Sequence, residues 1–191
     1  QMVVALKPIH DIAKITRVVV STYQSVSGAG SRAMYELESQ VNAFVQGMET
    51  PPCEKFPYPI AFNCIPQIDV FTENGFTKEE MKMVHESHKI LDPNIRVTAT
   101  CVRVPVFRCH AESVYIETEK KMTAQQARDA MSKAPGVQVA DNTANKEYPL
   151  QIYEEGRDPV YVGRIREDTG HDRGLNMWVV SDNIRKGAAL N

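Results

Sequence analysis

Two side chains capable of chemistry lie seven positions apart in the stretch from Cys101 to His110. Arg103 offers a planar, permanently charged guanidinium that matches a carboxylate or a phosphate, and His110 carries the side chain type whose ordinary pKa lies nearest neutrality. Together they indicate an anion-binding group beside a proton carrier. The structural alternative is a surface ion pair for Arg103 and a hydrogen bond in the core for His110.

The spacing of these two residues requires a bend in the chain. Side chains alternate between the faces of a strand, so a straight strand would point Arg103 and His110 in opposite directions. Pro105 lies between them and cannot donate a hydrogen bond to a sheet. We therefore expect Arg103 to end one strand and His110 to lie near the start of the next.

A second group of charges lies on a predicted helix. The run Thr77-Lys-Glu-Glu80 is a capping box, which predicts a helix over about 77–91. Glu79 and Lys82 are one turn apart on this helix, and such charges are usually a solvated pair. Met83 falls beside them, however, which indicates that this face of the helix is covered.

A glycine pattern between a predicted strand and a predicted helix resembles a cofactor motif. Gly28-x-Gly30-x-x-Ala33 formally fits the dinucleotide-binding fingerprint, which also needs a second parallel strand after the helix. The chain continues instead as Gly47-Met-Glu-Thr-Pro-Pro52, which cannot be a central strand. We therefore interpret both glycines as backbone turns that lead into a helix N-terminus.

The four cysteines predict neither a metal site nor a nucleophile. They are widely separated, without Cys-x-x-Cys or metal-like histidine spacing, so reduced thiols are expected. Cys64 follows Asn63, but Ile65-Pro66 supplies no positive neighbour that would favour a thiolate. We interpret Cys64 as a packing residue.

Composition places the chain among ordinary globular domains. The 191 residues are 42% hydrophobic and 24% charged, with a formal net charge of -2. The basic residues are scattered, so no nucleic-acid partner is expected. No apolar run approaches the roughly 20 residues that cross a bilayer, and the first residues lack the flanks of a secretory signal, so we expect no membrane contact and a cytoplasmic location.

Strands and helices are predicted from side-chain type and periodicity. Strands are expected over 16–22, 96–104, 112–118, 137–140, 160–166 and 175–181, with a short strand near 60–62. The pair 96–104 and 112–118 follows the capping-box helix. Residues 141–158 form a long polar loop of the kind that contacts partners. Gln1 lacks a cap, and a short helix with Asp182 or Asn183 as its cap closes the sequence, so we expect both ends to be cut from a longer chain.

Four motifs resemble one known family, the aspartate-semialdehyde dehydrogenases, in the family's order over essentially the whole chain. They are Ser21-Thr-Tyr-Gln-Ser-Val-Ser-Gly-Ala-Gly30, Glu79-Glu-Met-Lys-Met-Val84, Arg103-Val-Pro-Val with Cys109-His110, and Trp178-Val-Val-Ser-Asp-Asn-Ile-Arg-Lys-Gly-Ala-Ala189. The resemblance implies an α+β domain over 1–191 with a large mixed β-sheet and helices on one face, similar to the second domain of glyceraldehyde-3-phosphate dehydrogenase. It also implies a homodimer or homotetramer.

The family makes aspartate semialdehyde from aspartyl phosphate and NADPH through a cysteine thioester and releases phosphate, on the route to lysine, threonine and methionine. The resemblance assigns Gln24 to assistance at the nucleophile and His110 to acid/base catalysis. It assigns Glu79 to the substrate ammonium, Lys82 to phosphate and Arg103 to the substrate carboxylate, and places Asn183 near the nicotinamide amide. These assignments fit the chemistry of each side chain.

The sequence lacks two features of the family, the cysteine nucleophile and the cofactor domain. The Asn-Cys-(Ser/Thr)-Thr nucleophile motif and the cofactor domain precede the position of Gln1 in the family, and neither is in this sequence. We therefore expect NADPH to be bound mainly by the missing domain and the chain alone to be inactive. The alternatives are a free-standing amino-acid-binding or regulatory oligomerisation module, and a reductase of N-acetylglutamyl phosphate. Glu79 argues against that reductase, because its substrate has no free ammonium.

Overall fold

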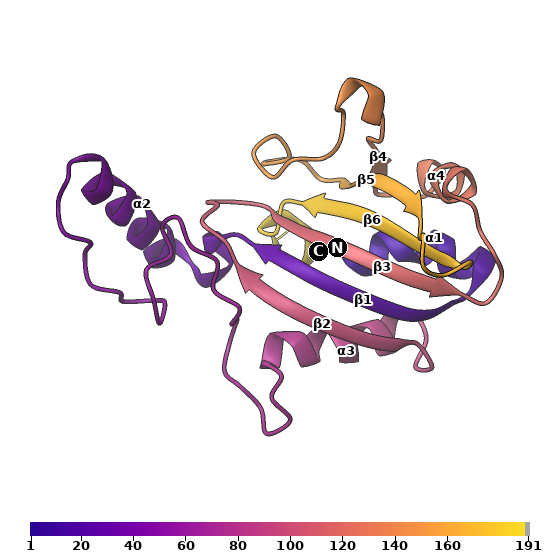
Figure 1. Ribbon diagram of the computed structural model, residues 1–191, viewed down its shortest axis with the longest axis horizontal. Helices are drawn as coiled ribbons and strands as arrows, with labels where there is room; N and C mark the ends of the chain where they lie inside the picture. Colours follow the sequence, from indigo (N-terminus) through magenta and orange to yellow (C-terminus); the bar gives the residue numbers. More distant parts are fainter. Residues whose placement is uncertain (190–191) are drawn as a thin grey trace.

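A six-stranded mixed sheet forms the centre of the computed structural model, which describes residues 1–189. The strand order is β2-β1-β3-β6-β5-β4 (Figure 1). The strands are β1 Ile15–Gln24, β2 Arg96–Arg103, β3 His110–Thr118, β4 Val137–Val139, β5 Val160–Glu167 and β6 Gly174–Ser181. The predicted α+β class, with a large mixed sheet, is confirmed.

The pairing of the strands differs from the order expected along the chain. β2 and β3 follow one another in sequence, but they do not pair, because β1 lies between them. β1 is parallel to β2 and antiparallel to β3. The connection between β2 and β3 crosses the end of β1, where Val26 and Ser27 donate backbone hydrogen bonds to Val106 and Phe107 at 2.9 and 3.1 Å. The expected pair 96–104 and 112–118 is therefore wrong as a pair, although both strands exist.

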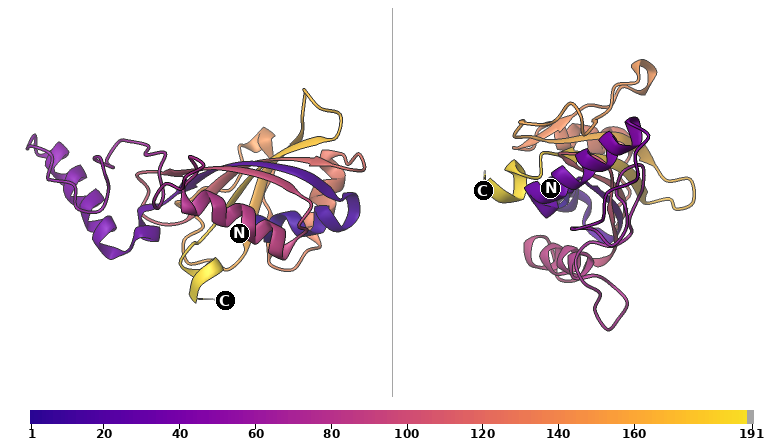
Figure 2. Two further views of the ribbon diagram at one scale, coloured as in Figure 1. Left: turned by 90° about the horizontal axis from the view of Figure 1, so that it is seen from below. Right: turned by 90° about the vertical axis from the view of Figure 1, so that its left-hand side faces the viewer.

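Three helices cover one face of the sheet, as expected. They are α1 Met2–Ala13, α3 Lys78–Ile90 and α4 Ala124–Ser132 (Figure 2). The main core lies between them and the sheet and includes Leu6, Ile9, Val18, Ile116 and Leu175, which are all fully buried. Within residues 1–189, no α-helix covers the opposite face of the sheet.

The fourth helix, α2 Ser31–Val45, departs from the expected layer and projects beyond the end of the sheet (Figure 1). This helix packs against the chain segments that precede and follow it. The contact forms a small separate core of Val26, Ala33, Leu37, Ile60 and Ile65. The predicted strand near 60–62 is wrong. The N–H groups of Ile60 and Ala61 donate to Oε1 of Gln40 at 2.9 and 3.0 Å, and Phe62 has a positive φ of 59°. These contacts replace a strand partner.

The described C-terminal residues form a turn. Oδ1 of Asp182 accepts hydrogen bonds from the N–H groups of Ile184 at 2.8 Å and Arg185 at 3.3 Å, so the expected cap is present. Arg185–Ala189 is not a regular α-helix, however, because Lys186 has an extended ψ of 119° and Gly187 a positive φ of 87°. The rest of the predicted helix, residues 190–191, lies outside the described part. Within residues 1–189, no helix has the length and apolar character needed to cross a membrane.

Candidate active site

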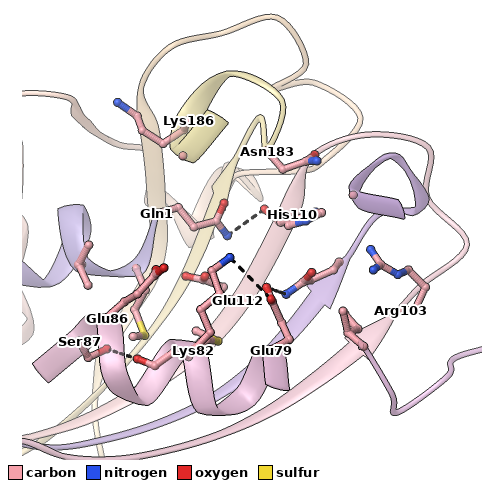
Figure 3. A pocket seen from close by; sticks show the side chains of 17 residues that line it. Gln1, Glu79, Lys82, Glu86, Ser87, Arg103, His110, Glu112, Asn183 and Lys186 are labelled. Atoms are coloured by element: carbon pink, nitrogen blue, oxygen red, sulfur yellow. Dashed lines mark hydrogen bonds and ion pairs between the residues drawn. The ribbon is translucent and has the colours of Figure 1, made fainter. Parts of the chain in front are cut away.

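A cleft of about 380 Å³ opens at the end of the sheet, between α3, the first residues of α1 and the segment after β6 (Figure 3). All six residues singled out from the sequence line it. They are Gln24, Glu79, Lys82, Arg103, His110 and Asn183. They come from five separate stretches of the chain, so the fold brings together groups that are up to 159 positions apart.

The sheet register explains how Arg103 and His110 reach the same cleft. Gln24, the last residue of β1, pairs with Arg103 at the end of β2 and with His110 at the start of β3. Residues directly opposite one another in neighbouring strands point to the same face of the sheet. The bend expected at Pro105 therefore returns the chain so that Arg103 and His110 lie on the two strands either side of Gln24, with their side chains on the same face. The expected strand end at Arg103 and strand start at His110 are confirmed.

Arg103 is held firmly and is only 6% exposed. Its Nη1 donates to the carbonyl oxygen of Ser25 at 2.6 Å, and its guanidinium carbon lies 6.0 Å from the centre of the Phe56 ring. Burial lowers the pKa of Arg103, and the Glu79 carboxylate partly offsets this. A guanidinium has five N–H donors, so the bond to Ser25 leaves donors for a carboxylate in the cleft.

His110 is half-buried at the cleft and close to Arg103. Its Nδ1 lies 3.1 Å from the backbone nitrogen of Ser25 and 3.1 Å from the Ser25 hydroxyl. A methyl group added at Gly28 would stand 3.2 Å from the imidazole Nε2 and 3.0 Å from Nη1 of Arg103. Burial and, secondly, the Arg103 charge lower the pKa of His110 to about 3. The imidazole and the Arg103 guanidinium therefore both lie beside Gly28 at the cleft.

The capping box of α3 is confirmed and sets the position of two further site residues. The N–H of Glu80 donates to Thr77 Oγ1 at 3.3 Å, and the Thr77 N–H donates to Glu80 Oε2 at 2.7 Å. The second oxygen of Glu80 accepts a hydrogen bond from the Cys101 N–H at 3.0 Å, which fastens the start of α3 to β2. Glu79 and Lys82 consequently face the cleft.

Glu79 and Lys82 are placed differently with respect to solvent. Glu79 Oε1 accepts a hydrogen bond from Gln24 Nε2 at 3.3 Å, so the buried glutamine orients the carboxylate. The Lys82 ammonium lies 3.7 Å from Glu79 Oε2, and its side chain is 59% exposed. An exposed pair at this distance contributes little to stability. The ammonium therefore remains able to bind an anion that enters the cleft.

Asn183 is tied to the loop that follows β1. Its Oδ1 accepts hydrogen bonds from the hydroxyls of Ser25 and Ser27, both at 3.2 Å, and its Nδ2 donates to Ser27 at 3.1 Å. The preceding residue, Asp182, is buried and accepts a hydrogen bond from the Gly156 N–H at 2.8 Å. The amide of Asn183 is therefore fixed at the cleft wall.

Some cleft residues were not anticipated from the sequence. They include Gln1, Gly28, Glu86, Glu112 and Lys186. Glu112 is 5% exposed, its Oε2 has no hydrogen-bond partner within residues 1–189, and burial raises its pKa to about 7. Strand alternation alone could have found it, because it lies two residues after His110 and so on the same face. Gly30 makes the expected turn with a φ of 92°, whereas Gly28 is needed for its close approach to two side chains.

The cysteines lie outside the chemistry of this cleft. Cys64 is exposed, so its interpretation as a packing residue is wrong, because the proline-rich segment around it runs over the surface. Cys101 and Cys109 are buried, and burial raises the pKa of each thiol to about 12. Within the described residues, no three metal-ligating side chains form a cluster.

Comparison with known proteins explains the motifs. The family profile described as semialdehyde dehydrogenase, dimerisation domain, matches residues 6–186. The chain belongs to this semialdehyde dehydrogenase family. The aspartate-semialdehyde dehydrogenase of Aquifex aeolicus is 59% identical over 192 residues, which cover 100% of this chain and 56% of that protein. The family resemblance carried by the four motifs is confirmed.

Solved structures of semialdehyde dehydrogenases agree with the fold. Aspartate-semialdehyde dehydrogenase II from Vibrio cholerae, complexed with ASA, has a TM-score of 0.95 and 49% identity over 100% of this chain and 56% of its own. The Candida albicans aspartate-semialdehyde dehydrogenase with NADP shares the fold at a TM-score of 0.68 and 23% identity, over 97% of this chain and 50% of its own. This chain thus spans little more than half the length of its relatives.

Proposed function

We propose that this chain is the substrate-binding and dimerisation part of an aspartate-semialdehyde dehydrogenase. The whole enzyme would convert aspartyl phosphate and NADPH to aspartate semialdehyde and phosphate through a cysteine thioester, in the cytoplasm, on the route to lysine, threonine and methionine. One observation carries the proposal: Arg103, Glu79 and Lys82 line a single cleft together with His110, and their charges complement this substrate.

The substrate presents one ammonium, one carboxylate and one phosphate. The buried, hydrogen-bonded guanidinium of Arg103 suits the carboxylate, because its planar fork can bind both oxygens. Glu79, oriented by Gln24, suits the ammonium. The exposed ammonium of Lys82 suits the phosphate, which arrives with the substrate and leaves as product. Each substrate charge thus has an opposite charge in the cleft.

His110 and Gln24 are the proposed catalytic residues. They are direct neighbours in the sheet, so their side chains emerge on the same face and at the same level. The imidazole can exchange a proton or a hydrogen bond with the reacting group, and the amide can both donate and accept without acting as a base. The catalytic cysteine and most of the cofactor site belong to the part of the enzyme outside this chain, so residues 1–191 alone should be inactive.

Asn183 is the proposed contact to the nicotinamide. Its Nδ2 carries two hydrogens, of which one is bonded to Ser27, so the other can meet a carboxamide oxygen. This donor suits NADPH, which would supply a hydride when bound. The hydrogen bonds from the Ser25 and Ser27 hydroxyls to Asn183 Oδ1 would keep that donor in place.

The dimer would form on the sheet face opposite the helices. Ile152 and Tyr153, in the loop 141–158, are 76% and 65% exposed. Trp178, whose side chain stands on that sheet face, donates from Nε1 to the Pro149 carbonyl at 3.1 Å and so attaches the loop to the face. Large exposed apolar side chains beside a helix-free sheet face are typical of a subunit interface. The family's description as a dimerisation domain supports the same partner.

The proposal is tested by measuring the phosphate-dependent oxidation of aspartate semialdehyde by NADP⁺ in the full-length protein. The absorbance of the NADPH formed gives the rate. Glu79→Gln should raise the KM for the semialdehyde, while the exposed Glu38→Gln on α2 should not. Faster turnover of N-acetylglutamate semialdehyde would favour the acetylated-substrate reductase instead. Amino-acid binding without any turnover would favour a binding or regulatory module.

A further inference from the structure

Two side chains of α2 hold the segment that follows this helix. The carboxylate of Glu36 accepts hydrogen bonds from the N–H groups of Glu54 at 3.0 Å and Lys55 at 2.6 Å. One turn along the helix, the side-chain oxygen of Gln40 accepts from the N–H groups of residues 60–61 at 2.9 and 3.0 Å. Both side chains are buried, and the Gln40 amide also donates to Glu36 at 3.4 Å. The segment is therefore fixed to α2 at two points.

The composition of this segment explains why it depends on α2. Residues 51–61 contain four prolines, which have no N–H and interrupt both helices and sheet ladders. Four of the N–H groups that remain are the ones bound by Glu36 and Gln40. Removal of either side chain would leave its N–H groups without these acceptors. The path of the segment is consequently set by two side chains of the helix.

Phe56 lies between the two points and meets the anion-binding group of the cleft. It is partly buried and packs against the small core between α2 and this segment. The guanidinium carbon of Arg103 lies over the Phe56 ring, 6.0 Å from its centre. A second link joins the same two parts, because Ile65 and Arg103 exchange backbone hydrogen bonds at 2.9 and 2.8 Å. The guanidinium is thus held by the Ser25 carbonyl at 2.6 Å and covered by the ring.

We propose that α2 is a positioning arm for the carboxylate site. Its two buried side chains fix the segment, and the Phe56 ring consequently stays over the guanidinium of Arg103. α2 projects beyond the end of the sheet toward which the β1 and β2 arrows point (Figure 1). Arg103 ends β2, so the guanidinium lies at this same end.

The ring has two effects on the guanidinium. A cation is attracted to the face of an aromatic ring, and more strongly where water is excluded. The Phe56 ring therefore limits how the Arg103 guanidinium can turn and keeps water from one side of it. A fork that is already oriented binds both oxygens of a carboxylate more tightly than a mobile one. The inference rests on the proposed function, because it takes the ligand of Arg103 to be the substrate carboxylate.

Kinetics of full-length variants test the role of the ring. Phe56→Leu keeps an apolar side chain but loses the ring face, so it should raise the KM for aspartate semialdehyde about tenfold and change kcat much less. Phe56→Tyr keeps the ring and should stay near the wild type. Tyr58→Leu is the control, because Tyr58 is an aromatic residue of the same segment and is 65% exposed. An unchanged KM in Phe56→Leu, or an equal rise in Tyr58→Leu, would overturn the proposal.

Combined variants test the path from α2 through the ring. Glu36→Ala removes the acceptor of two N–H groups and should raise KM, whereas Glu38→Ala, on the exposed side of α2, should not. In a Phe56→Leu background, Glu36→Ala should raise KM less than about twofold further, because the ring through which it acts is gone. Fully additive effects would contradict this path. Gln40→Ala releases the second point and makes the same comparison where Glu36→Ala does not fold.

A readout without substrate separates this proposal from the proposed function. In the full-length protein labelled with ¹⁵N in arginine, the Nε–H signal of Arg103 is identified by its loss in Arg103→Lys. The ring current of Phe56 contributes to the chemical shift of this signal, so Phe56→Leu should move it and Tyr58→Leu should not. An unmoved signal in Phe56→Leu would overturn the positioning arm. A moved signal in a protein without dehydrogenase activity would support the arm and contradict the proposed function.

Discussion

Nη1 of Arg103 donates a hydrogen bond to the carbonyl oxygen of Ser25 at 2.6 Å. The N–H of the same serine donates to Nδ1 of His110 at 3.1 Å. One residue of the loop after β1 therefore holds both the guanidinium and the imidazole. This arrangement fixes the anion-binding group relative to the proton carrier, whatever ligand enters the cleft.

Replacement of Arg103 by lysine should weaken substrate binding strongly. Lysine keeps the charge but cannot bind Ser25 and a carboxylate through one planar fork. Loss of a charge-assisted hydrogen bond corresponds to roughly 10- to 100-fold in KM. Steady-state kinetics of the full-length enzyme measure this. Arg108→Lys is the control, because Arg108 lies at the surface and pairs with Glu155 at 2.9 Å. Unchanged KM and kcat values in Arg103→Lys would contradict the role of Arg103 in substrate binding and show it to be an ordinary ion-pair residue.

Glu112 should make stability depend on pH near neutrality. Its pKa is raised from 4.5 to about 7 by burial, so the folded state favours the protonated form. The stabilisation from this proton is complete below the unfolded pKa and is lost as pH rises through about 7. The loss between pH 5 and pH 8 amounts to at most about 3 kcal/mol.

Denaturant unfolding of the wild type and Glu112→Gln at pH 5 and pH 8 measures this effect. The variant cannot ionise, so its stability relative to the wild type should improve at pH 8. Glu119→Gln is a control on the surface, where Glu119 pairs with Lys14 at 3.5 Å. Parallel pH dependence in the wild type and Glu112→Gln would show that Glu112 is ionised in the folded state at both pH values.

A charge at Ile152 should weaken the proposed dimer. Ile152→Asp would place a carboxylate in an apolar contact between subunits, where its desolvation is costly. Sedimentation of the full-length protein over a range of concentrations would show a higher dimer dissociation constant. Ile12→Asp is the matched control, because Ile12 is 57% exposed on α1, on the helix-covered side. A dimer disrupted by Ile12→Asp but not by Ile152→Asp would place the interface on the helix-covered side of the sheet and contradict the proposed interface.

Local sequence rules predicted most of the elements. The β-branched runs gave the six strands, and Thr77 with Glu80 gave the start of α3. The wrong predictions concern segments whose structure depends on contacts between residues that are distant in the sequence. The amide of Gln40 satisfies the backbone at residues 60 and 61, which no pattern near those residues indicates. The position of β1 between β2 and β3 likewise depends on long-range pairing.

The six site residues were found through motifs, whereas their mutual geometry required the fold. Gln24, Arg103 and His110 form one row only because three strands share a register. The hydrogen bonds by which Ser25 holds Arg103 and meets Nδ1 of His110 through its N–H are made by the backbone, so the residue type at position 25 gave no signal for them. Gly28 was interpreted as a turn residue because sequence cannot distinguish a glycine needed for φ from one needed for space.

His110 is proposed to act on the substrate rather than to stabilise the fold. The most direct measurement is kcat together with the melting temperature of His110→Asn, made on one preparation of the full-length enzyme. We predict a fall in kcat of about 10²–10³-fold, a much smaller change in KM than in Arg103→Lys, and a melting temperature near that of the wild type. A lower melting temperature with nearly normal turnover of the folded protein would contradict the account and make His110 a structural residue.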